Sequence, residues 1–193
     1  DGFENSRGKA RSIFFKIVRI LFNGNINNTT IEGLGVDGKG RLKNTLSYNA
    51  PNSWKCMSED YLFFEPKNQR ALSAYNLITG KFVEDSYISY KDLVGELMEA
   101  PYGMNDHEAL YLMAVVYANL SYCLRVSLNG VKITVGEWLD NVLPASGKGT
   151  IKIDFKKLSV TSFVKKNLAG VEAKFLQLFN MKKMRIFLNR FIK

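Results

Sequence analysis

One segment of the chain, residues 107–120, is apolar around most of a helical circumference. Leu110, Met113 and Tyr117 fall on one side of the predicted helix, and further apolar residues lie beside them. A helix that is hydrophobic all round is buried on every side in a globular protein. Asn105 or Asp106 precedes it as a candidate N-cap. The rest of the chain must therefore supply enough elements to enclose this helix.

The clearest local signal is a β-hairpin over residues 123–134. Apolar and polar residues alternate on both sides of the pair Asn129-Gly130. A type I′ turn needs positive φ at both central residues, and Asn-Gly is a preferred pair for it. We therefore expect Asn129 and Gly130 to form the tip of a two-residue hairpin.

Helical periodicity and capping signals predict further helices on both sides of the hairpin. They run over Phe3–Asn23, Arg41–Tyr48, Pro66–Ile78, Ser89–Met98 and Val135–Leu143, and a last helix capped by Thr161 or Ser162 runs to Ile192. Ile151–Phe155 alternates like an edge strand. The segment Thr29–Ile31 is either a short strand or a helical turn capped by Thr30.

These elements predict an α+β fold that is mainly helical. The order helix, helix, hairpin, helix is that of a winged-helix-like centre, which N-terminal and C-terminal helices flank. We divide the chain into an N-terminal helical segment with a Gly/Asn-rich linker (1–80), a winged-helix-like domain (81–158) and a basic C-terminal helix (159–193). At 193 residues, the chain has the length of one ordinary domain or of two small ones.

The net charge of +9 is concentrated at the C-terminal end of the chain. Residues 147–193 carry twelve Lys/Arg and two acids, a balance of +10, whereas the first 146 residues carry 15 basic and 16 acidic groups, a balance of −1. A basic segment favours an anionic partner such as nucleic acid, a lipid surface or an acidic protein face. The alternative is a solvated basic surface, or a contact with an acidic part of the same protein.

The sequence predicts neither a membrane span nor a secretion signal. No apolar run approaches the ~18 residues that a membrane-spanning helix needs. The chain begins with Asp1 and shows no apolar signal-peptide core. Its two cysteines, Cys56 and Cys123, are too few for a disulfide scaffold, so we expect a cytoplasmic setting. We interpret the sequence as a fragment or processed piece of a larger protein.

A phosphate-binding loop and a histidine site are both incomplete in this sequence. The run Gly33–Gly40 (GLGVDGKG) fits seven positions of such a loop, but Gly40 replaces the Ser or Thr that holds Mg²⁺. We therefore interpret the run as a flexible turn. The single histidine, His107, has no second His or nearby Cys with which to hold a metal. We expect His107 to have a capping or surface role.

Other chemistry-bearing residues are also explained without catalysis. Four acidic residues hint at paired carboxylates, although solvated helix ends explain them as well: Glu96, Glu99, Asp106 and Glu108. Cys123 is expected to be a small buried hydrophobic residue at the start of a strand. No GxSxG, HExxH or Ser/His/Asp arrangement is found. We therefore expect no catalytic residues, no metal and no cofactor, and we do not expect an independent enzyme.

The segment APYGMNDHEALYLMAVVYANL (Ala100–Leu120), with its Pro101-Tyr102-Gly103, resembles a region of very large bacterial P-loop ATPases from phage-defence systems of the BREX type and related systems. The segments YKDLVGELMEAPYG, LRVSLNGVKITV and NNTTIEGLGVDGKGRLKNTL also look like parts of these proteins. The resemblance covers Ile13 to Leu158, and it implies a non-catalytic module that follows the ATPase core. The phosphate-binding loop and acidic Mg²⁺ motif of that core are not visible here, so ATP hydrolysis is not carried over.

We expect a non-catalytic module of a phage-defence ATPase that binds nucleic acid through a basic wing and tail. The expected contact residues are the basic groups near the hairpin and the tail: Arg125, Lys132, Lys148, Lys152, Lys156 and Lys157. Such side chains contact phosphates, which gives affinity without sequence specificity. The alternative is a protein-interaction module whose basic amphipathic C-terminal helix docks on another chain or domain. Other domains or subunits of a larger assembly are expected partners.

Overall fold

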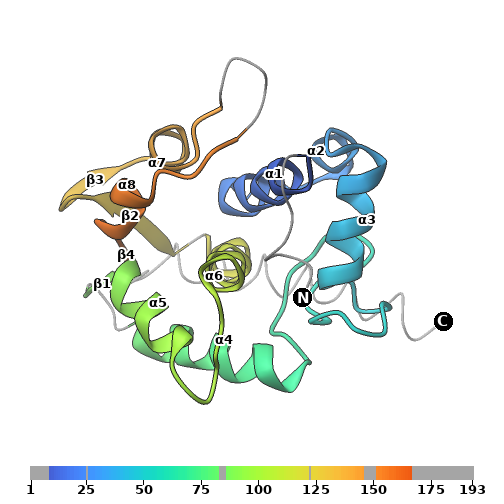
Figure 1. Cartoon of the computed structure of the whole chain (residues 1–193), viewed down its shortest axis with the longest axis horizontal. Helices are drawn as coiled ribbons and strands as arrows, with labels where there is room; N and C mark the ends of the chain where they lie inside the picture. The colour runs from blue at the N-terminus through green and yellow to red at the C-terminus, as the bar shows by residue number, and fades with distance from the viewer. Residues whose placement is uncertain (1–8, 25, 83–85, 122, 146–150, 167–193) are drawn as a thin grey trace, which may run out of the picture.

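The computed structural model describes residues 9–24, 26–82, 86–121, 123–145 and 151–166. The helices within these residues are α1 (Lys9–Asn23), α2 (Asn28–Glu32), α3 (Gly35–Leu46), α4 (Gln69–Lys81), α5 (Tyr90–Met98), α6 (Asp106–Leu120), α7 (Val135–Val142) and α8 (Phe155–Ser159). The strands are β1 (Tyr87–Ser89), β2 (Leu124–Leu128), β3 (Val131–Ile133) and β4 (Thr161–Lys165). Figure 1 shows their arrangement. The predicted mainly helical α+β class is confirmed.

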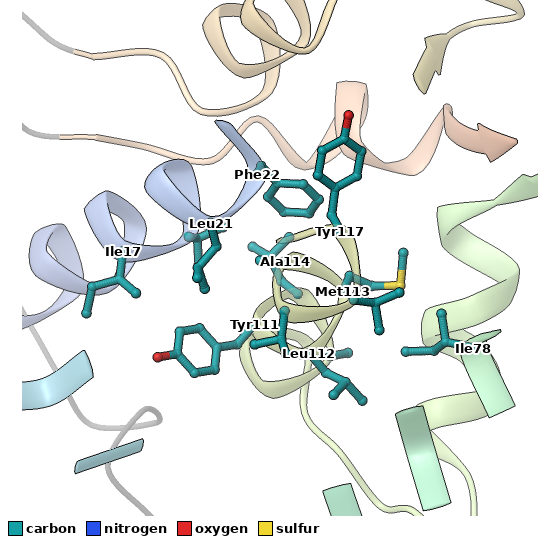
Figure 2. Packing of buried hydrophobic residues seen from close by; sticks show 14 of the residues in the cluster. Ile17, Leu21, Phe22, Ile78, Tyr111, Leu112, Met113, Ala114 and Tyr117 are labelled. Carbon is teal, nitrogen blue, oxygen red and sulfur yellow. The ribbon is translucent and has the colours of Figure 1, made fainter. Parts of the chain in front are cut away.

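Helix α6 lies at the centre of the fold. Every residue from Ala109 to Tyr117 is buried, and α1, α4 and α5 pack against the helix. Figure 2 shows Leu21 of α1 on one side of α6 and Ile78 of α4 on the other. The N-cap is Asn105 rather than Asp106. The apolar circumference of α6 is therefore enclosed by helices from well-separated parts of the described chain.

The hairpin forms as predicted and extends into a four-stranded antiparallel sheet. Asn129 and Gly130 have φ angles of 51° and 78°, the positive values that a type I′ turn requires. The strand order is β1-β4-β2-β3, so β2 and β4 are central and β1 and β3 are the edges. Val126 of β2 pairs with Ile133 of β3 and with Phe163 of β4. The winged-helix description of this region stays a prediction.

The chain before β4 differs from its prediction. Ile151–Phe155 does not form an edge strand, and Ile151 makes only an isolated bridge with Ala145. The Asp154 side chain instead accepts hydrogen bonds from the backbone N–H groups of Lys156 and Lys157, both at 3.1 Å. This cap starts α8, because it satisfies N–H groups that have no partner within the helix.

Thr161 and Ser162 do not cap a helix, because Thr161–Lys165 is strand β4. It pairs with β2 from Leu128↔Thr161 to Leu124↔Lys165. Without β4, one edge of β2 would leave its backbone N–H and C=O groups unpaired in a buried strand. The pairing of β4 with β2 is a requirement of the tertiary structure. The local sequence, a threonine before a basic amphipathic run, contains no signal for it. Most of the predicted terminal helix, residues 167–193, lies outside the described residues.

The N-terminal helix ends at Asn23 as predicted, and Gly24 follows it with a φ of 68°. The part of the prediction before Lys9 lies outside the described residues. The next segment is a helical turn, α2, and not a strand. Its N-cap is Asn27, and Thr30 completes the capping box from the third helical position.

The run Gly33–Gly40 is not a flexible turn. From Gly35 onward it belongs to α3, which replaces the shorter helix predicted over Arg41–Tyr48. Gly38 is buried, and a Cβ added there would lie 2.7 Å from the Cβ of Leu34. The absence of a side chain at Gly38 therefore permits a close contact within a helix, where the sequence pattern indicated a loop.

The Pro101-Tyr102-Gly103 segment forms the turn between α5 and α6. Arg70 of α4 holds this turn, since its guanidinium donates hydrogen bonds to the carbonyls of Tyr102 at 3.0 Å and Gly103 at 2.9 Å. Gly103 has a φ of 53°, which favours glycine. The turn is thus fixed to α4, and it sets the direction in which the central helix begins.

One hydrophobic core joins both sides of the predicted boundary between residues 80 and 81. It includes Leu21 and Leu46 from the N-terminal segment and Leu112, Trp138 and Phe163 from the later part of the chain. Helices α1 and α6 are in contact across that boundary. Among the helices of the described ranges, none combines the length and the apolar character that a bilayer crossing needs.

Candidate nucleic-acid interface

The sheet presents two different faces, because side chains alternate along each strand. On the inner face, the ring of Phe163 lies against Phe22 of α1, Tyr117 of α6 and Trp138 of α7. The distances between ring centroids are 6.3, 6.4 and 6.1 Å, respectively. Helices α1, α6 and α7 therefore pack on this face.

The opposite side of the sheet, which we call the outer face, consists of two cross-strand rows. One row runs over β1, β4 and β2 and contains Tyr87, Val164 and Arg125. The other runs over all four strands and contains Ser89, Ser162, Ser127 and Lys132. The three long side chains, Tyr87, Arg125 and Lys132, are exposed, whereas the smaller residues between them are half-buried or buried. On the outer face, three long exposed side chains therefore surround shorter side chains that are less exposed.

The tip of the hairpin lies against the end of α8, as Figure 1 shows. The backbone N–H of Asn129 donates to the carbonyl of Val160 at 2.9 Å, and Leu128 pairs with Thr161. Helix α8 itself packs on α5 and α7. This arrangement joins the hairpin, which carries Lys132, to α8, which carries Lys156.

The predicted contact residues have different surroundings in the structure. Three of them are exposed near the tip or around α8: Lys132, Lys152 and Lys156. Lys157 is half-buried, and its Nζ donates to the Asn141 Oδ1 at 3.0 Å. Lys157 therefore joins α8 to α7. Lys148 lies outside the described residues.

Arg125 is exposed on the outer face, away from the tip. The strand between Arg125 and Asn129 spans about 13 Å. The Nη1 of Arg125 donates to the Leu124 carbonyl at 2.9 Å. Burial raises the pKa of Tyr117 to about 12, and the positive charge of Arg125 opposes that rise. Along β2, Arg125 precedes by two residues Ser127, which pairs with Lys132.

Sequence reasoning missed the exposed apolar and aromatic residues of this region. Tyr87 is 48% exposed on the outer face, and three residues near the tip and α8 are 64%, 48% and 43% exposed: Val131, Phe155 and Val160. Aromatic rings among cations are typical of surfaces that bind nucleic acid. No sequence signal marked Tyr87, because a three-residue edge strand is too short to show an alternating pattern.

The single histidine and an acidic residue beside it have structural contacts. The ring of His107 is half-buried at the start of α6, with its centroid 5.5 Å from that of Phe14 and 6.0 Å from that of Phe15. Glu108 completes the capping box of α6 and pairs with Arg70 at 3.3 Å. The half-buried ring of His107 thus packs on α1.

Further candidate residues also have partners or are enclosed. Glu96 pairs with Lys81 at 2.5 Å, and Lys39 of the Gly-rich run pairs with Glu32 at 2.7 Å. Cys123, the residue before β2, is buried as predicted, and Cys56 is buried as well. Across the described ranges, no group of three or more His, Cys, Asp or Glu residues is placed to hold a metal ion.

Comparison with protein-family models, curated proteins and solved structures finds no match to the chain. The resemblance to phage-defence ATPases therefore rests on the quoted segments alone. The chemistry of the sheet, the hairpin and α8 is the remaining guide to function.

Proposed function

We propose that this chain is a non-catalytic module of a bacterial phage-defence ATPase and that it binds nucleic acid through the β2–β3 hairpin and α8. The hydrogen bond between Asn129 and Val160 supports the binding most directly, because it joins the hairpin to α8. The exposed cations of this region come from both elements and the segment before α8: Lys132, Lys152 and Lys156. A net charge of +9 favours an anionic partner.

The lysines of this surface contact phosphates in the proposed complex. A lysine ammonium is a flexible point charge that binds phosphate without distinguishing the bases. Lys157 contributes indirectly, because its Nζ is held by Asn141. Lys148 remains one of the predicted phosphate contacts. We therefore expect affinity with little sequence preference and with a steep dependence on salt.

A fluorescence-anisotropy titration with labelled duplex and single-stranded DNA, at several salt concentrations, tests this function. Replacing both Lys132 and Lys156 with Ala should weaken binding to all sequences about equally. The slope of log K against log salt should become shallower by about 0.9 for each duplex phosphate that the variant no longer neutralises. The matched control replaces Arg41 and Lys43, two exposed cations of α3, which changes the net charge equally.

The outcomes of this titration are distinct. Weaker nucleic-acid binding in the Lys132 and Lys156 variant alone supports the proposed surface. An equal weakening in both variants shows that net charge acts without a local site, which contradicts the surface. No binding by the unchanged protein at low salt contradicts the nucleic-acid function as a whole.

The alternative function is a protein-interaction module. Exposed apolar side chains near the hairpin tip favour it, because such groups mark surfaces that bind other proteins. They belong to Val131, Phe155 and Val160. Replacing Phe155 and Val160 with Ser should then abolish co-purification with other domains of the ATPase and leave nucleic-acid affinity unchanged. The C-terminal helix that this alternative predicts lies outside the described residues.

A further inference from the structure

We propose that the outer face of the sheet binds single-stranded nucleic acid, with one base stacked on the ring of Tyr87 and backbone phosphates held by Arg125 and Lys132. This inference rests on the proposed nucleic-acid function. It names the form of nucleic acid, and it adds a residue that lies outside the predicted contact set. The register of the strands and the exposure of three side chains support it.

The register places an aromatic ring and a cation in one row. Tyr87 of β1 pairs with Val164 of β4, which pairs with Arg125 of β2, so their side chains share a face. Adjacent strands lie about 4.8 Å apart, which separates the backbones at Tyr87 and Arg125 by about 10 Å. Lys132 lies in the next row, on the opposite edge strand. An extended strand that crosses the sheet therefore meets the ring at one edge and a cation at the other.

The residues between the ring and the cations are small. Val164 is 3% exposed and Ser127 is fully buried, whereas Tyr87 is 48% exposed. The exposed part of the Tyr87 ring offers a flat surface against which another flat group can lie. A nucleotide base is such a group, and any base can stack because every base has a π-face.

One of the short side chains on the outer face has a hydroxyl without a hydrogen-bond partner in the described structure. The hydroxyl of Ser127 is buried and makes no hydrogen bond within the described structure. Ser127 lies between Ser162 and Lys132 in its row. Because this hydroxyl is enclosed, a bound strand would contact the exposed side chains around it and not Ser127 itself.

A single strand suits this face better than a duplex does. The bases of a duplex are stacked on one another, and only a single strand presents free base faces to an aromatic ring. Reading a duplex requires an element that enters a groove, whereas Tyr87 is one side chain of a three-residue edge strand. Two of the three exposed long side chains are cations, Arg125 and Lys132, so an anionic strand fits the face better than an apolar protein surface.

The test measures the affinity of a labelled oligothymidylate, and of a labelled duplex of the same length, for the unchanged protein, Tyr87→Ala and Tyr87→Phe. Removing a base–aromatic stack should weaken single-strand binding by Tyr87→Ala about 10-fold. Tyr87→Phe keeps the ring and should bind like the unchanged protein. Duplex affinity should be the same in all three proteins. The matched control is Met98→Ala, which removes a side chain of similar exposure (50%) from α5 and should change neither affinity.

A second readout reports stacking directly. The fluorescence of an oligonucleotide that contains 2-aminopurine falls when that base stacks, so the unchanged protein and Tyr87→Phe should quench it and Tyr87→Ala should not. If Tyr87→Ala fails to fold, the other two proteins decide, because absence of quenching overturns the stacking.

Failure of this inference differs from failure of the proposed function. Equal single-strand affinity in Tyr87→Ala and the unchanged protein overturns the inference and leaves the nucleic-acid function standing. An equal weakening of single-strand and duplex binding in Tyr87→Ala also overturns it. No binding of either oligonucleotide by the unchanged protein overturns both.

Discussion

Trp138 of α7 donates its indole N–H to the hydroxyl of Thr161 in β4 at 2.9 Å, and both residues are fully buried. The Thr161 hydroxyl in turn donates to the carbonyl of Lys157 in α8 at 3.0 Å. One strand residue therefore links α7 to α8 and the sheet. Because α8 carries Lys156 and ends beside the hairpin tip, this buried link helps to position the exposed cations.

Thr161→Val tests that link. Valine keeps the shape of the side chain, but the buried Trp138 N–H is left without an acceptor, which costs about 1–3 kcal/mol. We expect the free energy of unfolding, measured by urea titration, to fall by about that amount. Ser162→Ala, on the outer face at the next position, should change it by less than about 0.5 kcal/mol. Equal stability of Thr161→Val and the unchanged protein would contradict the importance of the hydrogen bond.

Local signals explain which parts of the fold were predicted correctly. The Asn129-Gly130 turn requires only the backbone conformations of two residues, so the sequence contains all of its information. Ser89 at the start of α5 is similar, because an N-cap acts on backbone groups within one turn of itself. Thr161 shows the limit of such signals, since it has the chemistry of an N-cap and yet pairs with β2, a distant part of the chain.

Local sequence signals likewise account for some residues of the candidate site and not for others. The exposure of Lys132 and Lys156 agrees with the usual preference of lysine for the surface. The hydrogen bond between Lys157 and Asn141 depends instead on how α8 packs on α7. Tyr87 enters the outer face only because β1 pairs with β4, a long-range register that no local pattern encodes.

Arg19 of α1 provides a second test of how the elements are held together. Its Nη1 donates to the carbonyls of Leu139 at 3.0 Å and Leu143 at 2.8 Å, and its Nη2 pairs with Asp140. Arg19→Met keeps an apolar stem but removes the charged donor from the C-terminal end of α7. We expect the free energy of unfolding to fall by about 1.5–3 kcal/mol.

Asp140→Ala is the matched variant for Arg19→Met. Its side chain is 72% exposed, so removing the carboxylate should cost less than about 1 kcal/mol. Urea titrations of the two variants measure the difference. An equal decrease in both would show that the ion pair, and not the hydrogen bonds to the carbonyls of α7, supplies the stability.

Stability should fall at alkaline pH because of buried acids. Burial raises the pKa of Cys56 from 9.0 to about 12. The unfolded chain therefore releases this proton at lower pH than the folded chain does. The stability that this group contributes is complete below about pH 9 and is lost as the pH rises toward 12. Burial shifts the pKa of three tyrosine hydroxyls in the same direction: Tyr90, Tyr111 and Tyr117.

Urea titrations at a series of pH values above 9 measure this effect. The free energy of unfolding should decrease with pH, and Cys56→Ala should reduce the slope by up to about 1.4 kcal/mol per pH unit. The remaining slope comes from the tyrosines. A slope that is the same in Cys56→Ala and in the unchanged protein would show that the thiol ionises alike in the folded and unfolded chains.

Ser127→Ala separates stability from binding on the outer face. The substitution removes a buried hydroxyl that makes no hydrogen bond within the described structure, so the free energy of unfolding should stay constant or rise by up to about 1 kcal/mol. Most buried substitutions lower it instead. Because the hydroxyl is enclosed, the same variant should bind oligothymidylate as tightly as the unchanged protein does. Weaker binding by this variant would contradict the enclosure of the hydroxyl, and lower stability would mean that Ser127 has a partner in the folded protein.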